Sequence, residues 1–293
     1  MIRLLFFVAL IPAALAPTGA GAAEPAKKTF EVETKTDVAY RTDKDADPVK
    51  HKLDIYTPKG QKDFPVLMFV HGGAWKSGNK GMYAAIGHTF AKQGIGTVVI
   101  NYRLTDQKNE VKHPDHIKDV AAAFAWVHAN IGKYGGRNDR IFISGHSAGG
   151  HLVALLATDE RYLKEHKLGL KDIRGVMPLS GVYEIIPNIV VFDSQFGKDK
   201  EVCKAASPLT HVKDNHPPFL ICYADKDFPT IDKMSETFCK KLCDSKCEAQ
   251  ALKIDGRNHF TIIIQLALSA ADPCTDAMLD FIAKHSEWKR PAK

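Results

Sequence analysis

A sharp turn between a strand and a helix is encoded at residues 145–149, which read Gly-His-Ser-Ala-Gly. The apolar run Arg140–Ser144 enters this segment, and the helical pattern Gly150–Leu156 leaves it. A G-x-S-x-G segment in this context is typical of a nucleophile elbow, where glycines allow a turn too tight for side chains. The dipole of the following helix favours negative charge at its start. The sequence therefore predicts Ser147 as a nucleophile. The alternative is a small-residue turn that only packs a helix on a strand.

A second glycine segment follows the apolar strand candidate Pro65–Val70 and reads His-Gly-Gly-Ala-Trp at residues 71–75. Segments of this type supply backbone N–H groups to an oxyanion hole. Glycines suit this role because bare backbone can approach a charged oxygen closely. We expect Gly72 and Gly73 to contribute to the hole, together with Ala148, the residue after the nucleophile.

Chain order restricts the base. A nucleophile of this kind is followed by the acid and then by the histidine. Only His259 and His285 come after the last clear apolar run, Pro218–Ala224. His285 lies in an amphipathic, helix-like segment, whereas His259 follows a strand candidate and a polar loop. The sequence therefore predicts His259 as the general base.

Two aspartates compete for the role of the acid. Asp225 and Asp227 both follow the run Pro218–Ala224. Either carboxylate could hold an imidazole in one tautomer and stabilise its charged form. Asp227 lies deeper in the turn, just before Phe228 and Pro229, so it is favoured, and Asp225 remains the alternative.

Composition excludes several classes of protein. The chain has 293 residues, of which 45% are hydrophobic and 25% are charged, as in ordinary globular proteins. The net charge of +6 comes from scattered lysines, and no nucleic-acid-binding signature is present. The predicted chemistry needs no metal or organic cofactor. The oligomeric state does not follow from the sequence.

The N-terminus reads as a signal peptide over residues 1–23. Arg3 precedes the apolar stretch Leu4–Leu15, and the small residues at positions 20–22 resemble a cleavage site. The apolar stretch is too short to span a bilayer as a stable helix. We therefore expect a secreted or periplasmic protein without stable membrane insertion.

Export would place six cysteines in an oxidising compartment, where disulfides persist. Structural disulfides are therefore expected, although the sequence cannot choose among the pairings. Cys222 is an exception, because its position within an apolar run suits a buried free thiol. The cysteines are Cys203, Cys222, Cys239, Cys243, Cys247 and Cys274.

Strand and helix patterns alternate from Pro65 to Trp288, which predicts an α/β fold with a mostly parallel sheet and helices on both faces. The alternating segments Phe30–Tyr40 and Lys50–Tyr56 suit half-exposed antiparallel edge strands. We expect one domain over residues 24–293, with a short cap insertion at about 182–207. Trp75 and Phe192 are candidates for the wall of a substrate pocket, although packing inside the fold is the alternative for both.

Five segments in this order resemble the α/β-hydrolase esterases, from about Leu53 to Phe281. The most similar groups are carboxylesterases near the hormone-sensitive-lipase type, enzymes of the kynurenine formamidase type and bacterial feruloyl-esterase-like enzymes. Many lipase-type members have an aspartate where this chain has His146, which favours the latter two groups. The segments are His71–Trp75, Asn101–Leu104, His113-Pro114 with Asp119, Gly145–His151 and Gly256–Phe260.

The resemblance implies Ser147, Asp227 and His259 as the triad and Gly72, Gly73 and Ala148 in the oxyanion hole. Together with the signal peptide, it favours an exported serine carboxylic-ester hydrolase acting on small or carbohydrate-linked esters, with an acetyl or feruloyl group as the acid part. Two alternatives remain open: an amide hydrolase of formamidase or serine-peptidase type, and an inactive binding protein on the same scaffold.

Overall fold

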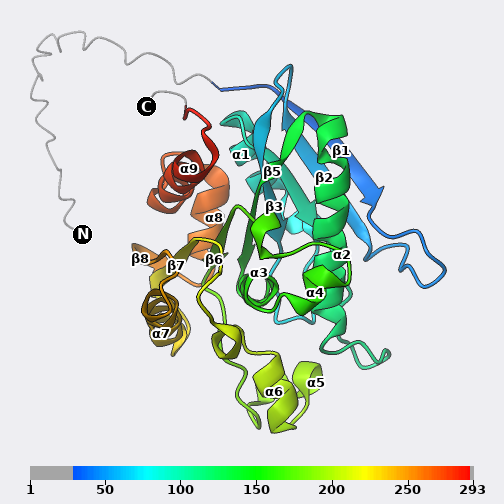
Figure 1. Cartoon of the computed structure of the whole chain (residues 1–293), viewed down its shortest axis with the longest axis vertical. Helices are drawn as coiled ribbons and strands as arrows, with labels where there is room; N and C mark the ends of the chain where they lie inside the picture. The colour runs from blue at the N-terminus through cyan, green and yellow to red at the C-terminus, as the bar shows by residue number, and fades with distance from the viewer. Residues whose placement is uncertain (1–28, 291–293) are drawn as a thin grey trace, which may run out of the picture.

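Eight strands form one sheet in the computed structural model, which describes residues 29–290 (Figure 1). The predicted signal peptide lies outside the described residues. The strand order is β1-β2-β4-β3-β5-β6-β7-β8, and only the pairs of β2 with β1 and with β4 are antiparallel. The strands are β1 (Val32–Ala39), β2 (Lys52–Pro58), β3 (Phe64–Val70), β4 (Gly96–Ile100), β5 (Gly136–His146), β6 (Gly175–Leu179), β7 (Phe219–Lys226) and β8 (Ala249–Asn258).

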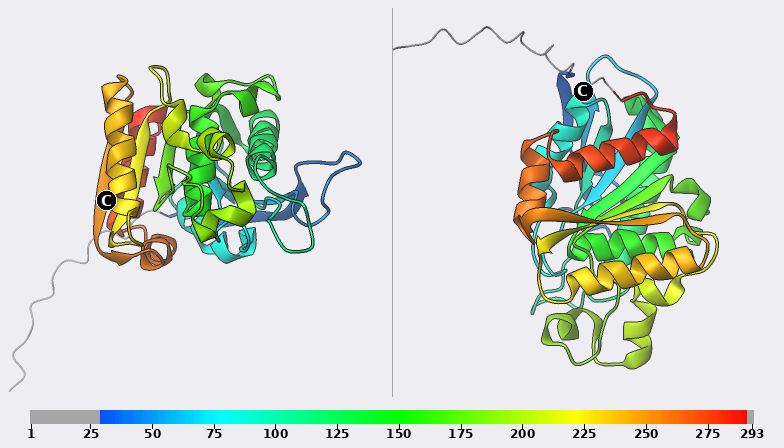
Figure 2. Two further views of the ribbon diagram at one scale, coloured as in Figure 1. Left: turned by 90° about the horizontal axis from the view of Figure 1, so that it is seen from below. Right: turned by 90° about the vertical axis from the view of Figure 1, so that its left-hand side faces the viewer.

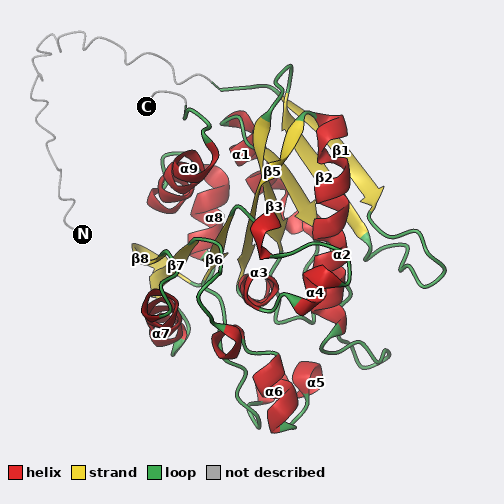
Figure 3. Cartoon of the chain, in the orientation of Figure 1, coloured by secondary structure: helices red, strands yellow, loops and turns green. Residues whose placement is uncertain are grey.

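Helices cover both faces of this sheet (Figures 2 and 3). α2, α3 and α7 pack into one apolar core, and α1, α8 and α9 pack into a second core on the opposite face. The predicted α/β architecture is thereby confirmed. The α-helices are α1 (Ala84–Lys92), α2 (Asp115–Asn130), α3 (Ala148–Thr158), α4 (Arg161–Lys164), α5 (Val190–Phe196), α6 (Lys200–Ala205), α7 (Ile231–Asp244), α8 (Thr261–Leu268) and α9 (Pro273–Ser286). Short 3-10 helices occupy Lys80–Tyr83, Ile131–Tyr134, Leu170–Asp172 and Pro208–His211.

The central strands are buried because both of their faces are covered. Every residue of β3, β4 and β6 is buried, as expected for parallel strands between two helical layers. Of the two predicted half-exposed edge strands, β1 does lie at the antiparallel edge, but none of its residues is buried. β2 pairs with β4 as well as with β1, so it lies inside the sheet and six of its seven residues are buried.

The carboxyl ends of the parallel strands bring the candidate residues together. β3 ends one residue before the segment 71–75, and β5 ends one residue before Ser147. β7 ends one residue before Asp227, and β8 ends one residue before His259. Because parallel strands end at the same edge of a sheet, four segments far apart in sequence converge there.

The predicted insertion at 182–207 contains α5 and α6, which lie together at one end of the molecule (Figure 1). α5 is fixed to the glycine segment after β3, because the side-chain amide of Gln195 donates to the carbonyl of Ala74 over 2.8 Å. No single helix among residues 29–290 is long and apolar enough to cross a membrane. α8 and α9 reach the required length and apolar composition only when they are taken as a pair, and this pair is bent by 66°.

The six cysteines all lie in the described part of the chain, and none forms a disulfide there. The expected disulfides are therefore not found in the structure. Cys239 and Cys243 lie one turn apart on α7, and burial together with the neighbouring Cys243 raises the pKa of the Cys239 thiol. Cys222 is buried and unpaired, as predicted. Its thiol contacts that of Cys274, which together with burial raises the pKa of Cys274.

A buried carboxylate ties the loop after β4 to α2. Asp119 is fully buried and accepts hydrogen bonds from the guanidinium of Arg103 at 2.8 and 2.9 Å. His51 Nε2 lies 3.1 Å from the same carboxylate. Burial alone would raise the pKa of Asp119, but the contacts with His51 and Arg103 lower it below the ordinary value.

We expect Asp119→Asn to lower the free energy of unfolding by about 3 kcal/mol, because it removes the buried carboxylate that pairs with the partly buried guanidinium of Arg103. Urea unfolding at neutral pH measures this change. Because the folded-state pKa is lowered, the contribution of the carboxylate is complete above its ordinary pKa and is lost as the pH falls through the lowered value. The difference between the two proteins should therefore shrink below about pH 4.

The matched control is Asp115→Asn, which removes a neighbouring, partly exposed carboxylate 3.5 Å from Arg103. We expect it to cost at most about 0.5 kcal/mol. Equal losses in the two variants would contradict the account.

Candidate active site

Ser147 lies on a strained turn between β5 and α3. Its backbone has a φ of 55° and a ψ of −115°, which an L-residue adopts only under constraint. The flanking glycines make the turn possible. A Cβ on Gly145 would lie 2.5 Å from the backbone of Gly149, and a Cβ on Gly149 would lie 2.1 Å from the carbonyl of Val70. The turn leaves Ser147 partly exposed, while the residues on either side of it are buried.

A continuous line of hydrogen bonds joins three of the predicted residues. His259 Nε2 lies 3.0 Å from Ser147 Oγ, and His259 Nδ1 lies 2.6 Å from Asp227 Oδ1. A carboxylate can only accept, so the imidazole carries its proton on Nδ1. Nε2 is then free to accept the hydroxyl proton of Ser147. This is the arrangement in which a histidine can act as a general base toward a serine.

The carboxylate of Asp227 is held by its own partners. Its Oδ2 accepts from the hydroxyl of Ser180 and from the amide of Ala224, and its Oδ1 accepts from the amide of Phe228. Burial alone would raise the pKa of Asp227, but the hydrogen bonds from His259 and Ser180 lower it below the ordinary value. The group is therefore a carboxylate at neutral pH.

Ser180 is a residue that the sequence analysis missed. It directly follows β6, just as Ser147, Asp227 and His259 directly follow their strands. That shared position is the signal that could have identified it. The other aspartate, Asp225, is exposed, and its Oδ1 accepts from the amide of Arg257 over 2.8 Å.

Gly73 and Ala148 remain the candidate donors of the predicted oxyanion hole. Gly73 has a φ of 116°, and a Cβ there would lie 2.2 Å from the carbonyl oxygen of Ser77. Within residues 29–290 its amide has no hydrogen-bond partner. Ala148 is the first residue of α3, where an amide has no partner inside the helix. Both N–H groups are thus free for a ligand.

Gly72 differs from the prediction. Its amide donates to the hydroxyl of Tyr83 over 3.1 Å, so it is already occupied and is not a free oxyanion donor. The sequence could not reveal this, because the acceptor lies 11 residues away on a separate helix. Position 72 still requires a glycine, since a Cβ there would lie 2.8 Å from the carbonyl oxygen of His146.

Trp75 and Phe192 are buried, which contradicts their expected place on an accessible pocket wall. The indole N–H of Trp75 donates to His151 Nδ1 over 3.3 Å. The ring of Trp75 packs edge-on against Phe192 and Phe196 of α5. These ring contacts add to the hydrogen bond between Gln195 and Ala74 in holding α5 against the rest of the fold.

Two exposed aromatic rings flank the histidine instead. Phe228 stacks on His259 with ring centroids 4.1 Å apart and is 50% exposed. Phe260 meets both rings edge-on and is 59% exposed. We call Phe228 and Phe260 the aromatic wall. It places apolar surface directly beside the imidazole of His259.

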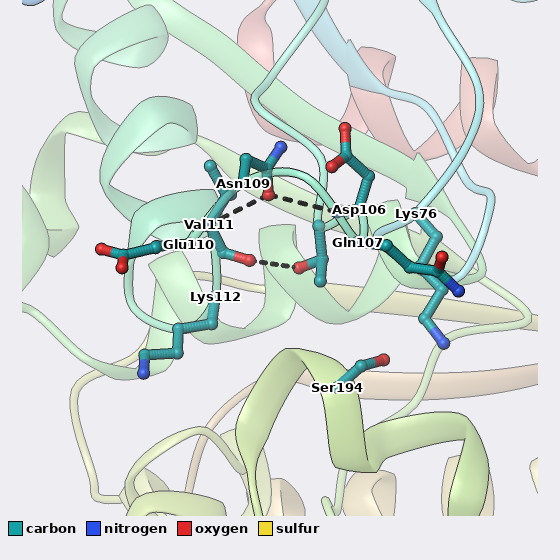
Figure 4. A pocket seen from close by; sticks show the side chains of 9 residues that line it. Lys76, Asp106, Gln107, Asn109, Glu110, Val111, Lys112 and Ser194 are labelled. Carbon is teal, nitrogen blue, oxygen red and sulfur yellow. Dashed lines mark hydrogen bonds between the residues drawn. The ribbon is translucent and has the colours of Figure 1, made fainter.

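A separate open pocket of about 600 Å³ lies between the loop after β4 and α5 (Figure 4). None of the triad residues lines it, although Lys76 connects it to the glycine segment that follows β3. Its lining is rich in groups that can bind hydroxyls. The lining residues are Lys76, Thr105, Asp106, Gln107, Asn109, Glu110, Val111, Lys112 and Ser194.

Comparisons with known proteins identify similar chains. The family model described as BD-FAE matches residues 53–242. Esterase LipC of Mycobacterium tuberculosis is 32% identical over 71% of this chain and 56% of its own length. A probable isoprenylcysteine alpha-carbonyl methylesterase of Arabidopsis thaliana, ICMEL1, is 28% identical over 75% of this chain and 50% of its own. The chain thus spans about half the length of these curated relatives.

A solved structure with a similar fold is a truncated form of a carbohydrate esterase from gut microbiota. It superposes with a TM-score of 0.74 and 24% identity, covering 90% of this chain and 99% of that one. At this identity the match concerns the fold alone. It confirms the α/β-hydrolase fold that the motifs predicted.

A fluorophosphonate probe, which reacts with activated serines, can test the geometry without a known substrate. We expect Asp227→Asn to slow labelling by roughly 100- to 10,000-fold, because the imidazole loses the group that fixes its tautomer. Asp225→Asn, the matched control, should stay within about threefold, since that carboxylate bonds only to surface backbone. A larger loss in Asp225→Asn would move the acid role to that residue.

Proposed function

This chain belongs to the BD-FAE family, and from that premise we propose that it is a serine hydrolase that cleaves carboxylic esters through an acyl-enzyme on Ser147. The observation that carries the proposal is the unbroken line from Asp227 through His259 to Ser147 Oγ. The strained turn between β5 and α3 presents the Ser147 hydroxyl at the end of this line. The esterases among the relatives support the same reaction class.

The first half of the reaction forms the acyl-enzyme. Ser147 Oγ attacks the ester carbonyl carbon while His259 Nε2 takes the hydroxyl proton. The carbonyl oxygen becomes an oxyanion and accepts hydrogen bonds from the amides of Gly73 and Ala148. When the intermediate collapses, His259 returns the proton to the leaving alkoxide, and the alcohol departs.

The second half releases the acid. His259 takes a proton from water, the resulting hydroxide attacks the acyl carbon, and the same two amides hold the new oxyanion. Collapse breaks the bond to Ser147 Oγ, which recovers its proton from His259. Asp227 stays ionised throughout and stabilises the imidazolium in each half, in agreement with its lowered pKa.

For the substrate we propose small or carbohydrate-linked esters with an acetyl or feruloyl acid part. The aromatic wall supports this class, because an exposed ring can stack on a planar aryl group or on the apolar face of a sugar. Polar side chains in the pocket beside Lys76, among them Gln107 and Asn109, offer further groups for hydroxyls.

Hydrolysis of p-nitrophenyl acetate and of methyl ferulate tests the reaction class. We expect measurable kcat/KM on at least one ester and a loss of at least about 1000-fold in Ser147→Ala, which removes the nucleophile. A preference for ferulate would indicate an aromatic acyl site, and a preference for acetate a small one. Activity that survives in Ser147→Ala would overturn the proposal. Serine-dependent activity confined to anilide substrates would instead favour an amide hydrolase.

Phe228→Ala tests the aromatic wall. Loss of the stacked ring should lower kcat/KM for methyl ferulate by roughly 10-fold, and for p-nitrophenyl acetate by no more than about threefold. The ratio of the two losses in kcat/KM is independent of any general effect on His259, because both substrates use the same base. Equal losses on the two esters would mean that Phe228 supports the histidine rather than the substrate. Phe219→Leu, a buried aromatic substitution in β7, controls for general loss of packing.

A further inference from the structure

Two side chains outside the triad connect the oxyanion segment to the catalytic histidine. The amide of Gly72 lies 3.1 Å from the hydroxyl of Tyr83, which lies 3.2 Å from His146 Nδ1. On the other edge of the same imidazole, His146 Nε2 lies 2.8 Å from the backbone carbonyl oxygen of His259. These three contacts form one continuous line, which we call the Tyr83–His146 bridge.

The ends of the bridge fix the position of every proton in it. A backbone amide can only donate and a backbone carbonyl can only accept. The carbonyl of His259 therefore requires a proton on His146 Nε2, which leaves a lone pair on Nδ1 in the neutral ring. Nδ1 then accepts the hydroxyl proton of Tyr83, and the Tyr83 oxygen accepts from Gly72. All the donors point in one direction, so the bonds reinforce one another.

The burial of both side chains suits these protonation states. His146 is 4% exposed, and burial together with the neighbouring His259 lowers its pKa to about 4, so the ring is neutral at neutral pH. Burial raises the pKa of Tyr83, so its hydroxyl keeps its proton. The bridge is also tightly packed. A Cβ on Gly72 would lie 3.0 Å from His146 Nδ1 and 3.1 Å from the Tyr83 oxygen.

We propose that Tyr83 and His146 are positioning residues. They fix the position of the Gly73 amide, the oxyanion donor, relative to His259, the general base. The bond to Gly72 fixes the backbone immediately before the Gly73 amide. The bond to the His259 carbonyl fixes the backbone of the residue whose ring meets Ser147. Neither positioning residue touches Ser147 Oγ in the hydrogen-bond network, so each acts through the groups that it holds.

This arrangement explains why a histidine precedes the nucleophile in this chain. A residue at position 146 lies between the glycine segment and the histidine loop and must offer an acceptor on one side and a donor on the other. The two nitrogens of a neutral imidazole supply both at a fixed separation. A carboxylate offers acceptors only and could not bond to the His259 carbonyl.

The test rests on the proposed ester hydrolysis and uses the full chain. Tyr83→Phe removes one oxygen atom and keeps the ring. We expect kcat per active site, counted by burst titration, to fall roughly 10- to 100-fold, the effect of misplacing reacting groups by about an ångström. KM should change less than about twofold. The affinity for a trifluoromethyl ketone, which mimics the tetrahedral intermediate, should fall in parallel with kcat/KM.

Tyr102→Phe is the matched control. The hydroxyl of Tyr102 donates to the carbonyl of His71 in the same segment, and it has no bond to His146 or His259. We expect its kcat to stay within about threefold of the unmodified protein. A loss equal to that of Tyr83→Phe would assign the effect to general loosening of the segment and overturn the proposal.

Position 146 provides a rescue experiment. His146→Leu removes both bonds, whereas the side-chain amide of His146→Gln can still donate toward the His259 carbonyl. We expect the glutamine variant to keep at least about fivefold more activity than the leucine variant, with similar thermal unfolding midpoints. Equal kcat in the two variants, or kcat of Tyr83→Phe equal to that of the unmodified protein, would overturn the bridge. Activity persisting in Ser147→Ala would instead overturn the proposed function itself.

Discussion

The close backbone approach beneath Ser147 is the constraint on which the rest of the site depends. The loop that ends β3, the end of β5 and the start of α3 meet where only glycine fits, at Gly145 and Gly149. A non-glycine residue held at positive φ stores about 1–3 kcal/mol of strain. The burial of all eleven residues of α3 offsets this cost. The same crossing places the start of α3 against the backbone of Val70 and His71, immediately before the glycine segment that contains Gly73.

The scaffold and the proposed substrate-facing surface, Phe228 and Phe260, are separable in this molecule. Ser147, Asp227 and His259 each follow a strand that the sheet holds in place. Phe228 and Phe260 come one residue after the acid and the base, and both are exposed. Their side chains can therefore change without disturbing the strand ends. Rigid strands with variable neighbouring loops are how one fold serves many substrates.

Local sequence predicted the parts of the site that depend on local structure. Strand, turn and helix patterns were sufficient to find the elbow at Ser147 and the α/β class, because each element is encoded by its own residues. The choice between Asp225 and Asp227 stayed open, since it depends on which carboxylate reaches a histidine 32 residues away. The same limit explains Gly72 and Trp75, whose partners Tyr83 and His151 could be found only from the fold. The disulfide prediction relied on composition and compartment, whereas pairing depends on distances between side chains.

The central claim is that Ser147 becomes acylated during turnover. Rapid quenching of the reaction with p-nitrophenyl acetate in acid, followed by peptide mass spectrometry, measures this directly. The account predicts one acetyl group on the peptide that contains Ser147, appearing within the first turnover and disappearing as the substrate is exhausted. It predicts no acetylated peptide in Ser147→Ala. Turnover with no acetyl group on Ser147, or with the group on another side chain, would contradict it.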